Sequence, residues 1–441
     1  MMTKPRLDGI YLLLIGTLLF LILGIALEQN SPHAMQDFRV LYNPARCLLQ
    51  HCDPYNEREV LRLYREEGGD QQSETPVVRV IVTRYIYPPT AFLCTVPFAS
   101  LPWRTAHILW MTFTLGGIIV ASFFAWDLGA TYAPILSSVM VGFLLINSVS
   151  IVISGNSAGL AVSLCVVAVW CFMRERIRVI GILCLAISLA IKPHDTGLVW
   201  LLFFFAGGVY RKRALQALAV LAALSLPLVI WVSEVSPRWV QEMQSNLSSF
   251  SVHGGLNDPS PSAAVANGPG MLTNLQALFS VYRDDPHFYN LATYAVCAPL
   301  LLLWAFMVLR TRTSQAKVWL ALAAIVTLTL LPIYHREYDA KLLLLTVPAC
   351  AMLWAEGGFN SWLAVLVNGT AIFINGDLPQ AMLLGWINRL HGTGRSDQGL
   401  AAMQAFPAPM VLLVMAVFYL WVCVGPWMRN RDTPVDPPNP R

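Results

Sequence analysis

The stretch GIYLLLIGTLLFLILGIAL at 9–27 decides the fold class of this chain. It has no charged side chain, and a helix needs about 20 mostly apolar residues to cross the ~30 Å hydrocarbon core of a bilayer. The whole chain of 441 residues is 56% hydrophobic and only 12% charged, whereas soluble proteins have about 25% charged residues. The sequence therefore predicts an all-α polytopic membrane protein, with residues 1–441 forming a single integral membrane domain.

Further apolar segments are candidate membrane-spanning helices. They lie near 87–101, 105–127, 132–152, 157–173, 178–192, 195–210, 214–233, 289–309, 317–334, 340–355, 359–375 and 405–428. Basic residues collect between or beyond them, at Arg174/Arg176/Arg178, Arg211/Lys212/Arg213, Arg310/Arg312/Lys317 and Arg429/Arg431. Because short cytoplasmic loops carry an excess of Lys and Arg, these clusters mark the cytoplasmic side. Lys4 and Arg6, which precede 9–27, place the amino terminus on the same side.

Two termini on one side require an even number of spans, but the apolar segments are odd in number when 9–27 is included. The shortest of them, 87–101, contains Pro88, Pro89 and Pro97 and is the candidate for a re-entrant segment. That interpretation leaves a bundle of about 12 spans, within a range of about 11–13. A half-crossing within 132–173 is the alternative.

The first polar interruption, 28–86, is expected to be an external loop with amphipathic helices on the membrane surface. Ser31-Pro32 is a typical helix start. Apolar residues then recur at helical spacing, with Asp37 at the edge of the apolar arc. Pro44 is expected to kink or split this helix.

A second helix in this loop is expected to run from the capping residue Asn56 to Gly68-Gly69. Cys47 and Cys52 both lie in this loop. If the loop is outside the cytoplasm, these cysteines are able to form a disulfide, and free thiols are the alternative.

The second polar interruption, 234–288, is expected to be another external loop. It contains Asp284-Asp285 followed by His287, which has the residue types of a metal or acid pair. No further acid stands at supporting spacing, so a solvated turn is the preferred interpretation. The Pro-rich segment 429–441 is expected to be a disordered cytoplasmic tail.

Most of the unusual polar residues fall at the inferred external face. An ionisable side chain at the edge of a span costs free energy unless it is paired or solvated, so each is a candidate functional residue. An interfacial or structural ion pair is the alternative for each one. The residues are Asp37, Arg39, Arg84, Asn156, Lys192, His194, Asp195, Tyr334, His335, Arg336, Glu337, Tyr338 and Asp339.

Several runs resemble glycosyltransferase family 87, in the GT-C class of membrane glycosyltransferases. They are DFRVLYNPARCLLQHCDPYN at 37–56, YPPTAFLCTVPFASLPW at 87–103, GNSAGL at 155–160, IKPHDTGL at 191–198 and YHREYDAKLLLL at 334–345. The resemblance implies a GT-C-like bundle and an inverting transfer of a hexose, with mannose favoured, from a polyprenyl-phosphate sugar. The acceptor would be an envelope lipid or glycan. The site would face the external or periplasmic side of a bacterial inner membrane, with both termini in the cytoplasm.

The resemblance also implies that Asp37 is the general base, because transfer requires deprotonation of an acceptor hydroxyl. The candidates for binding the donor phosphate are Lys192, His335, Arg336, Arg39 and Arg84. The candidates for binding the acceptor or supporting the site are Asn156, His194, Tyr334 and Asp339. The sequence gives no reason to require a metal or another cofactor, and it predicts no nucleic-acid partner.

Three other functions remain possible from the sequence. A transporter or flippase of lipid-linked saccharide would be expected to show internal repeats and acids in mid-span. A non-catalytic membrane assembly protein would use the loops 28–86 and 234–288 to bind a partner. A transferase of another lipid-linked group is the third.

Overall fold

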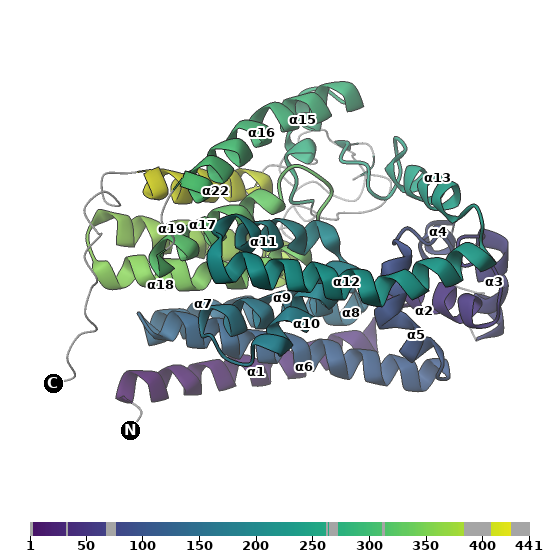
Figure 1. The fold of residues 1–441 in the computed structure, drawn as a ribbon, viewed down its shortest axis with the longest axis horizontal. Helices are drawn as coiled ribbons and strands as arrows, with labels where there is room; N and C mark the ends of the chain where they lie inside the picture. The colour runs from purple at the N-terminus through teal and green to yellow at the C-terminus, as the bar shows by residue number, and fades with distance from the viewer. Residues whose placement is uncertain are drawn as a thin grey trace.

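The computed structural model describes residues 3–31, 34–67, 76–261, 263, 272–310, 314–382 and 407–424. Within these residues all regular secondary structure is helical, and one isolated β-bridge joins Leu272 to Arg336. Many of the helices run side by side along the long axis of the molecule (Figure 1). The tail at 429–441, expected to be disordered, lies outside the described residues.

Six helical segments in the described ranges are long and apolar enough to cross a membrane. They are α1 (Lys4–Asn30), α6 (Trp103–Ala130), the pair α7 (Pro134–Ile146) and α8 (Val149–Ser154), α12 (Gly208–Val235), α16 (Pro286–Arg310) and α22 (Pro407–Val424). Shorter helices pack among them: α9 (Ala158–Met173), α10 (Arg178–Ile191), α11 (Pro193–Ala206), α17 (Gln315–Thr329), α18 (Val347–Glu356) and α19 (Phe359–Ile374). The prediction of an all-α polytopic membrane protein is confirmed.

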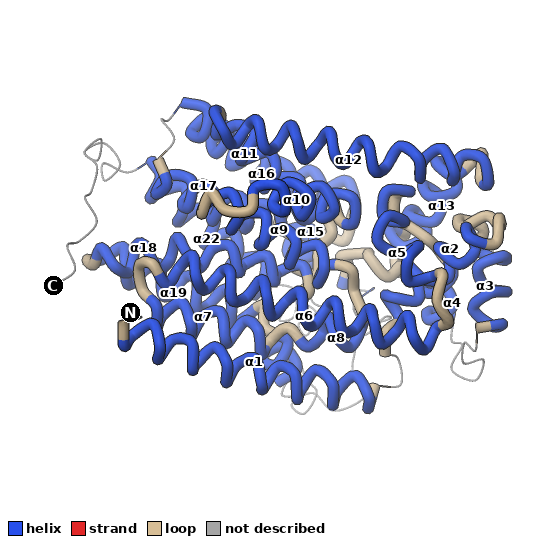
Figure 2. Tube along the Cα trace, turned by 60° about the horizontal axis from the view of Figure 1, so that its bottom comes forward, coloured by secondary structure: helices blue, strands red, loops and turns tan. Residues whose placement is uncertain are grey.

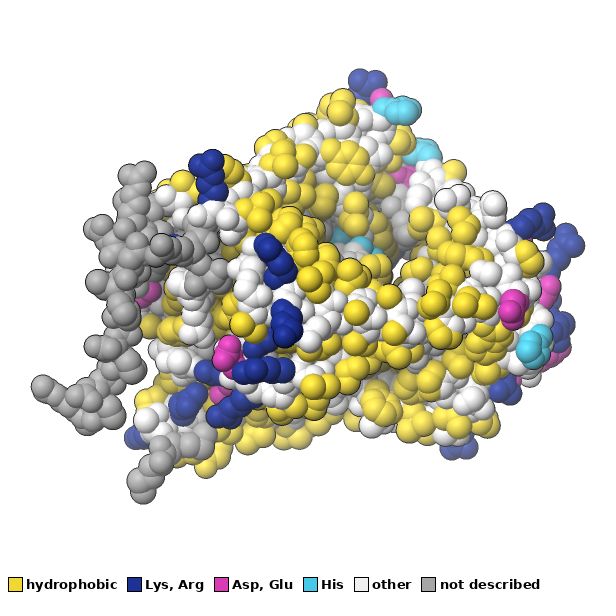
Figure 3. Space-filling model, in the orientation of Figure 1, with side chains coloured by type: hydrophobic (Ala, Val, Ile, Leu, Met, Phe, Trp, Pro, Cys, Tyr) yellow, Lys and Arg dark blue, Asp and Glu magenta, His cyan; other side chains and the backbone are white. Residues whose placement is uncertain are grey.

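The outer faces of α12 and α16 are apolar and largely uncovered. Within the 18-residue apolar stretch of each helix, only 17% of the residues are buried inside the protein. Leu226 on α12 is 61% exposed and Leu302 on α16 is 71% exposed. Figure 3 shows apolar side chains over much of this surface. In water such a surface would cause the protein to associate, whereas lipid tails solvate it. These faces therefore indicate that the protein lies in a bilayer.

Small residues allow α1 and α7 to pack closely, and the two helices lie side by side in Figure 2. A Cβ atom added to Gly16 would lie 3.1 Å from the Cα atom of Gly142 in α7. One added to Gly9 would lie 2.7 Å from the hydroxyl oxygen of Ser138. The hydrophobic effect does not drive helices together in lipid, so van der Waals contact across such residues stabilises the pair.

The first loop contains three helices instead of two: α2 (Gln36–Leu49), α3 (Glu57–Glu66) and α4 (Pro76–Thr83). The expected helix start at Ser31 is wrong, because α1 continues through the polar residues to Asn30 and Ser31 ends it. Pro44 lies inside α2 without splitting it. The cap expected at Asn56 is confirmed, since its side chain accepts a hydrogen bond of 3.0 Å from the backbone N–H of Arg58.

The apolar face of α2 packs on protein, whereas a helix lying on the membrane surface was expected. The ring of Phe38 stacks on Trp110 of α6 with 4.5 Å between centroids, and both side chains are fully buried. Cys47 in the last turn of α2 and Cys52 beyond its end form a disulfide. This crosslink closes the turn that follows the helix and is typical of an oxidising compartment.

The proline-containing segment 87–101 holds a short 3₁₀ turn, η1 (Pro89–Ala91), and the helix α5 (Phe92–Ala99). At about 1.5 Å per residue, a helix the length of α5 extends over about 12 Å, well short of a bilayer core. α5 also packs against α2 of the first loop. These features favour a re-entrant segment over a crossing.

The contact between α1 and α7 provides a test of the packing. Gly16→Val places a branched side chain against the backbone of Gly142, and we expect a loss of about 1–3 kcal/mol from overpacking. The matched control is Gly116→Val on α6, where an added Cβ meets nothing within 4 Å. Thermal unfolding in detergent should show a lower midpoint for the first variant only. Equal midpoints for the two variants would contradict this account of the interface.

Candidate active site

Apart from Arg84, the polar residues selected from the sequence lie in four segments that meet where the first loop joins the bundle. The segments are the first turn of α2, the turn between α8 and α9, the junction of α10 and α11, and the stretch before and into η2 (Asp339–Thr346). On this side of the molecule Figure 3 shows a hollow between α12, α13 (Trp239–Ser251) and α16, with a histidine side chain set back in it.

Asp37 is held by one partner and keeps one oxygen free. The Nδ2 group of Asn156 donates a hydrogen bond of 2.7 Å to Oδ2 of Asp37. The Oδ1 atom of Asn156 accepts from the backbone N–H of Ala158 at 2.8 Å, which fixes the orientation of the amide. In the described part of the chain no hydrogen bond or ion pair to Oδ1 of Asp37 is found, and the carboxylate is partly exposed. A structural ion pair, which is the alternative role for Asp37 from the sequence, is therefore not found among the described residues.

The approach of α2 to Asn156 depends on the preceding glycine. Gly155 has φ +66°, and an added Cβ would lie 2.5 Å from Sδ of Met35 and 2.9 Å from Cβ of Phe38. Met35 caps α2 with a left-handed backbone and donates its N–H to the carbonyl of Ile153 at 2.7 Å. Glycine adopts this positive φ without strain and leaves the space that α2 occupies.

Lys192 is a buried cation enclosed by two carboxylates. Pro193 begins α11, so Lys192 stands between two helices with its backbone out of helical conformation. Its Nζ atom, on a side chain that is 5% exposed, donates a short hydrogen bond to Asp339 and lies 3.6 Å from Oδ2 of Asp195. It also lies 4.8 Å from the ring centroid of Tyr338. The ammonium has lost water and gained ionic partners, as a buried charge requires.

His335 continues this cluster through Asp195. Its Nδ1 atom lies 3.1 Å from the carbonyl oxygen of Ile333, which can only accept, so Nδ1 carries a proton. The other nitrogen, Nε2, lies 3.4 Å from Oδ1 of Asp195. Burial alone would lower the pKa of His335, but the pairing with Asp195 and the charge of Asp339 outweigh it and raise that pKa.

With His335 protonated, two cations and two carboxylates balance in the buried cluster. The same carboxylate oxygen of Asp195 lies 3.4 Å from Nε2 of His194, which is partly exposed. One ligand atom from each of His194, Asp195 and His335 lies within 4.8 Å of the others, a set that suits a divalent ion. No feature of the sequence requires a metal, and a proton on His335 satisfies the same geometry.

Two tyrosines connect Asp37 with the Lys192 cluster. Burial is the main cause that raises the pKa of Tyr87 to about 12, and Lys192 and Asp37 are among the charges that act on it. Asp37 and Asp339 likewise act on Tyr338. The base candidate and the buried cations therefore border one region.

The other residues selected from the sequence divide into two groups. Arg336 lies in the same turn as His335, where its Nε group donates to the hydroxyl of Tyr334 and its Nη2 group donates to the carbonyl of Leu256 at 2.8 Å. Arg84 instead pairs with Glu57 at 3.2 Å. The guanidinium of Arg39 stacks 3.9 Å from the ring centroid of Trp103. Arg39 and Arg84 therefore have partners outside the Lys192 cluster.

From the sequence, Asp195, Glu337 and Tyr338 are candidates only as polar residues of the external face, without a role in the site, and Tyr87 is not a candidate. Asp195 could have been found from its spacing, since it stands in the first turn of α11 three residues after Lys192. Glu337 is a partly buried carboxyl beside the cluster, and burial raises its pKa to about 6.

The Asp284-Asp285 pair lies in a solvated turn, as the sequence predicts. Asp285 pairs with Arg283 at 2.8 Å and accepts the backbone N–H of His287 at 3.0 Å. His253 lies 3.7 Å from Asp284. Asp284 and His287 are exposed, so these groups are open to solvent.

The sequence model of glycosyltransferase family 87 matches residues 85–334, more than half of the chain. The match includes Asn156, Lys192 and His194, and it ends before His335 and begins after Asp37. No curated protein and no solved structure matches the chain. By the extent of the family match, the chain belongs to glycosyltransferase family 87.

Proposed function

We propose that this protein is an inverting membrane glycosyltransferase that moves a hexose, with mannose favoured, from a polyprenyl-phosphate sugar to a lipid or glycan acceptor. Family membership supplies the glycosyl transfer. The choice of donor rests on the resemblance of the first loop and of the turn at 191–198 to polyprenyl-phosphate-dependent members. The observation that carries the proposal is the carboxylate of Asp37, oriented by Asn156 with one oxygen free, which acts on the same two tyrosines, Tyr87 and Tyr338, as the charges of the buried Lys192 cluster.

In the proposed reaction Asp37 is the general base. Its free oxygen takes the proton of the acceptor hydroxyl as the acceptor oxygen attacks the anomeric carbon. The bond between the anomeric carbon and the phosphate oxygen breaks, and its electron pair leaves with the polyprenyl phosphate. The leaving group is a stable phosphate anion, so a dedicated acid is less necessary than in glycoside hydrolysis. One carboxylate is sufficient for a single displacement with inversion.

The donor phosphate is proposed to bind on the other side of the same region. Lys192 and protonated His335 supply buried positive charge, and Arg336 adds a guanidinium in the adjoining turn. Asp195 and Asp339 orient these cations and reduce their net charge. A phosphate that arrives in such a water-poor site interacts more strongly than it would in water. His194 and Tyr334 are the supporting residues at the edge of the cluster.

We further propose twelve spans, both termini in the cytoplasm and a site on the external face. In this count α7 and α8 together form one crossing, and α5 does not cross. The disulfide between Cys47 and Cys52 supports an external first loop, because cytosolic thiols are kept reduced. Arg174 follows α9 and Arg213 lies near the start of α12, so α10 separates Arg174 from the Lys192 junction and α11 separates Arg213 from it, as the positive-inside rule requires.

The general-base assignment is tested by Asp37→Asn. We expect the variant to fold normally and to lose transfer from a polyprenyl-phosphate sugar by at least ~10²-fold, since the amide cannot accept the proton. The measurement is product formation from a panel of radiolabelled donors with membrane lipid extract. Glu66→Gln is the control, because Glu66 is an exposed carboxylate of the same loop that pairs only with Arg62 in the described structure. Normal turnover by Asp37→Asn would refute the assignment and favour a non-catalytic or transport role.

The charge of His335 gives a pH dependence. Its pKa is raised, so the imidazolium persists above the ordinary value of about 6.5 and is lost only as pH rises through the raised pKa. We expect kcat/KM for the donor to fall on that alkaline side. The same proton stabilises the fold at low pH, and this contribution is lost over the same rise in pH.

The matching variant is His335→Gln, which should be slow at every pH and lack the alkaline decline. His194→Gln is the control, because His194 is more exposed and its loss leaves His335 paired with Asp195. Thermal unfolding would show that both variants are folded. An alkaline decline that survives in His335→Gln would assign the titration to another group.

A further inference from the structure

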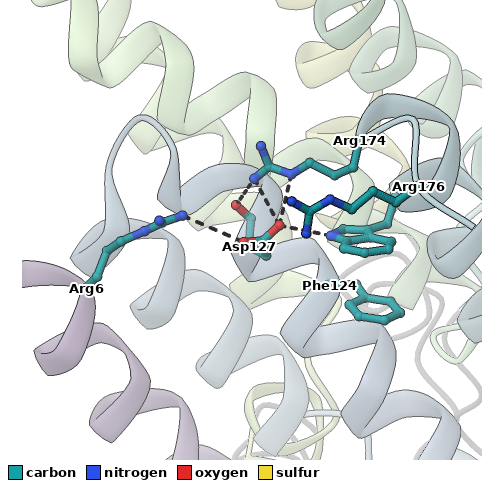
Figure 4. Close-up of a pocket in the computed structure, with 6 residues that line it drawn as sticks. Arg6, Phe124, Asp127, Arg174 and Arg176 are labelled. Atoms are coloured by element: carbon teal, nitrogen blue, oxygen red, sulfur yellow. Dashed lines mark hydrogen bonds and ion pairs between the residues drawn. The ribbon is translucent and has the colours of Figure 1, made fainter. Parts of the chain in front are cut away.

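A second polar site lies away from the Lys192 cluster, at the end of the bundle where α1 begins and α6 and α9 end. It is a pocket of about 570 Å³ lined by Arg6, Phe124, Asp127, Trp170, Arg174 and Arg176. Figure 4 shows the guanidinium groups of Arg6 and Arg174 reaching toward Asp127, with that of Arg176 beside them. Three arginines and one carboxylate leave the pocket with a net positive charge.

Asp127 accounts for only part of this positive charge. Its Oδ2 atom accepts from Nε of Arg174 and from Nε1 of Trp170, both at 2.9 Å, and its Oδ1 atom lies 3.7 Å from Nη2 of Arg6. Arg174 also donates to the carbonyl of Asp127 at 2.6 Å. The carboxylate therefore fixes two of the three arginines and has no interaction with the third.

The remaining donors have no partner in the described part of the chain. No hydrogen bond or ion pair of the Arg176 side chain is found there, and the residue is exposed. The Nε atom of Arg6 is buried and has no hydrogen-bond partner among the described residues. A buried donor without a partner costs free energy, so an anion in the pocket would gain the unused guanidinium of Arg176 and the unpaired Nε donor of Arg6. A structural ion pair alone explains neither the open volume nor Arg176.

The surroundings of the pocket suit a lipid. The rings of Phe124 and Trp170 stack with 4.4 Å between centroids and give the pocket an apolar wall. On α1, Leu7 directly follows Arg6 of the pocket and Tyr11 lies one turn further, and these side chains, 41% and 63% exposed, offer an apolar surface to acyl chains. A free anion would use the charge of the pocket and not this apolar border.

We propose that this pocket binds the phosphate of an anionic glycerophospholipid, with the acyl chains running along the exposed face of α1. Arginine is suited to phosphate because its planar donors match two oxygens. The proposal is independent of the proposed glycosyl transfer.

The test uses the full-length protein in nanodiscs and in neutral detergent. Phosphatidylglycerol should bind and raise the unfolding temperature, with native mass spectrometry counting the bound lipid. Phosphatidylcholine, inorganic phosphate and glycerol phosphate, each at the same concentration, should have little effect. Arg176→Gln should weaken phosphatidylglycerol binding on the order of tenfold.

Arg178→Gln is the matched control, because Arg178 belongs to the same basic cluster but lies outside the pocket and approaches Glu175 at 3.9 Å. Its lipid binding should match that of the wild type. Equal weakening in both variants would show general charge attraction and overturn the site. If inorganic phosphate bound as tightly as phosphatidylglycerol, the ligand would be a soluble anion and the lipid proposal would be wrong. We expect Arg176→Gln to transfer sugar at the wild-type rate. A negative result for lipid binding would therefore not count against the proposed glycosyl transfer.

Discussion

The buried ammonium of Lys192 sets the condition that the rest of the site must meet. A charge taken out of water costs several kcal/mol unless carboxylates and hydrogen bonds replace the lost solvent. Asp195 comes from the next helical turn, whereas Asp339 comes from 147 residues further along the chain. The same Asp339 accepts the backbone N–H of Arg336 at 3.0 Å and so folds the turn that presents His335 to Asp195. One desolvated cation thus fixes the relation of two distant segments.

The fold class could be predicted from the sequence because long apolar runs such as 9–27 have one stable arrangement in a bilayer. The candidate residues could also be found, since Asp37, Lys192 and His335 are ionisable groups at the ends of apolar segments. Their pairing could not. It depends on the left-handed backbone at Gly155 and on the irregular stretch before η2, and neither follows from hydrophobic periodicity.

The arginines show why residue type is a weak guide to phosphate sites. Arg39, Arg84 and Arg336 all stand on the inferred external side, and the sequence offers no way to rank them. Arg84 is paired with Glu57, 27 residues earlier, and Arg39 is covered by Trp103. Arg336 remains in the turn that carries His335. The donors of Arg6 and Arg176 that are unpaired among the described residues lie in the pocket with Phe124 and Trp170. From the sequence, these arginines indicate only which side of the membrane they face.

Gly155 restricts how this chain is able to vary. Its carbonyl accepts from the indole of Trp110 at 2.9 Å, and its missing side chain makes room for Met35 and Phe38. Alanine at this position would have to displace the start of α2, and Asp37 would move with it. In a library of random variants, position 155 should therefore tolerate almost no replacement although it touches no substrate. Relatives that keep Asp37 but replace this glycine would need smaller side chains at Met35 and Phe38.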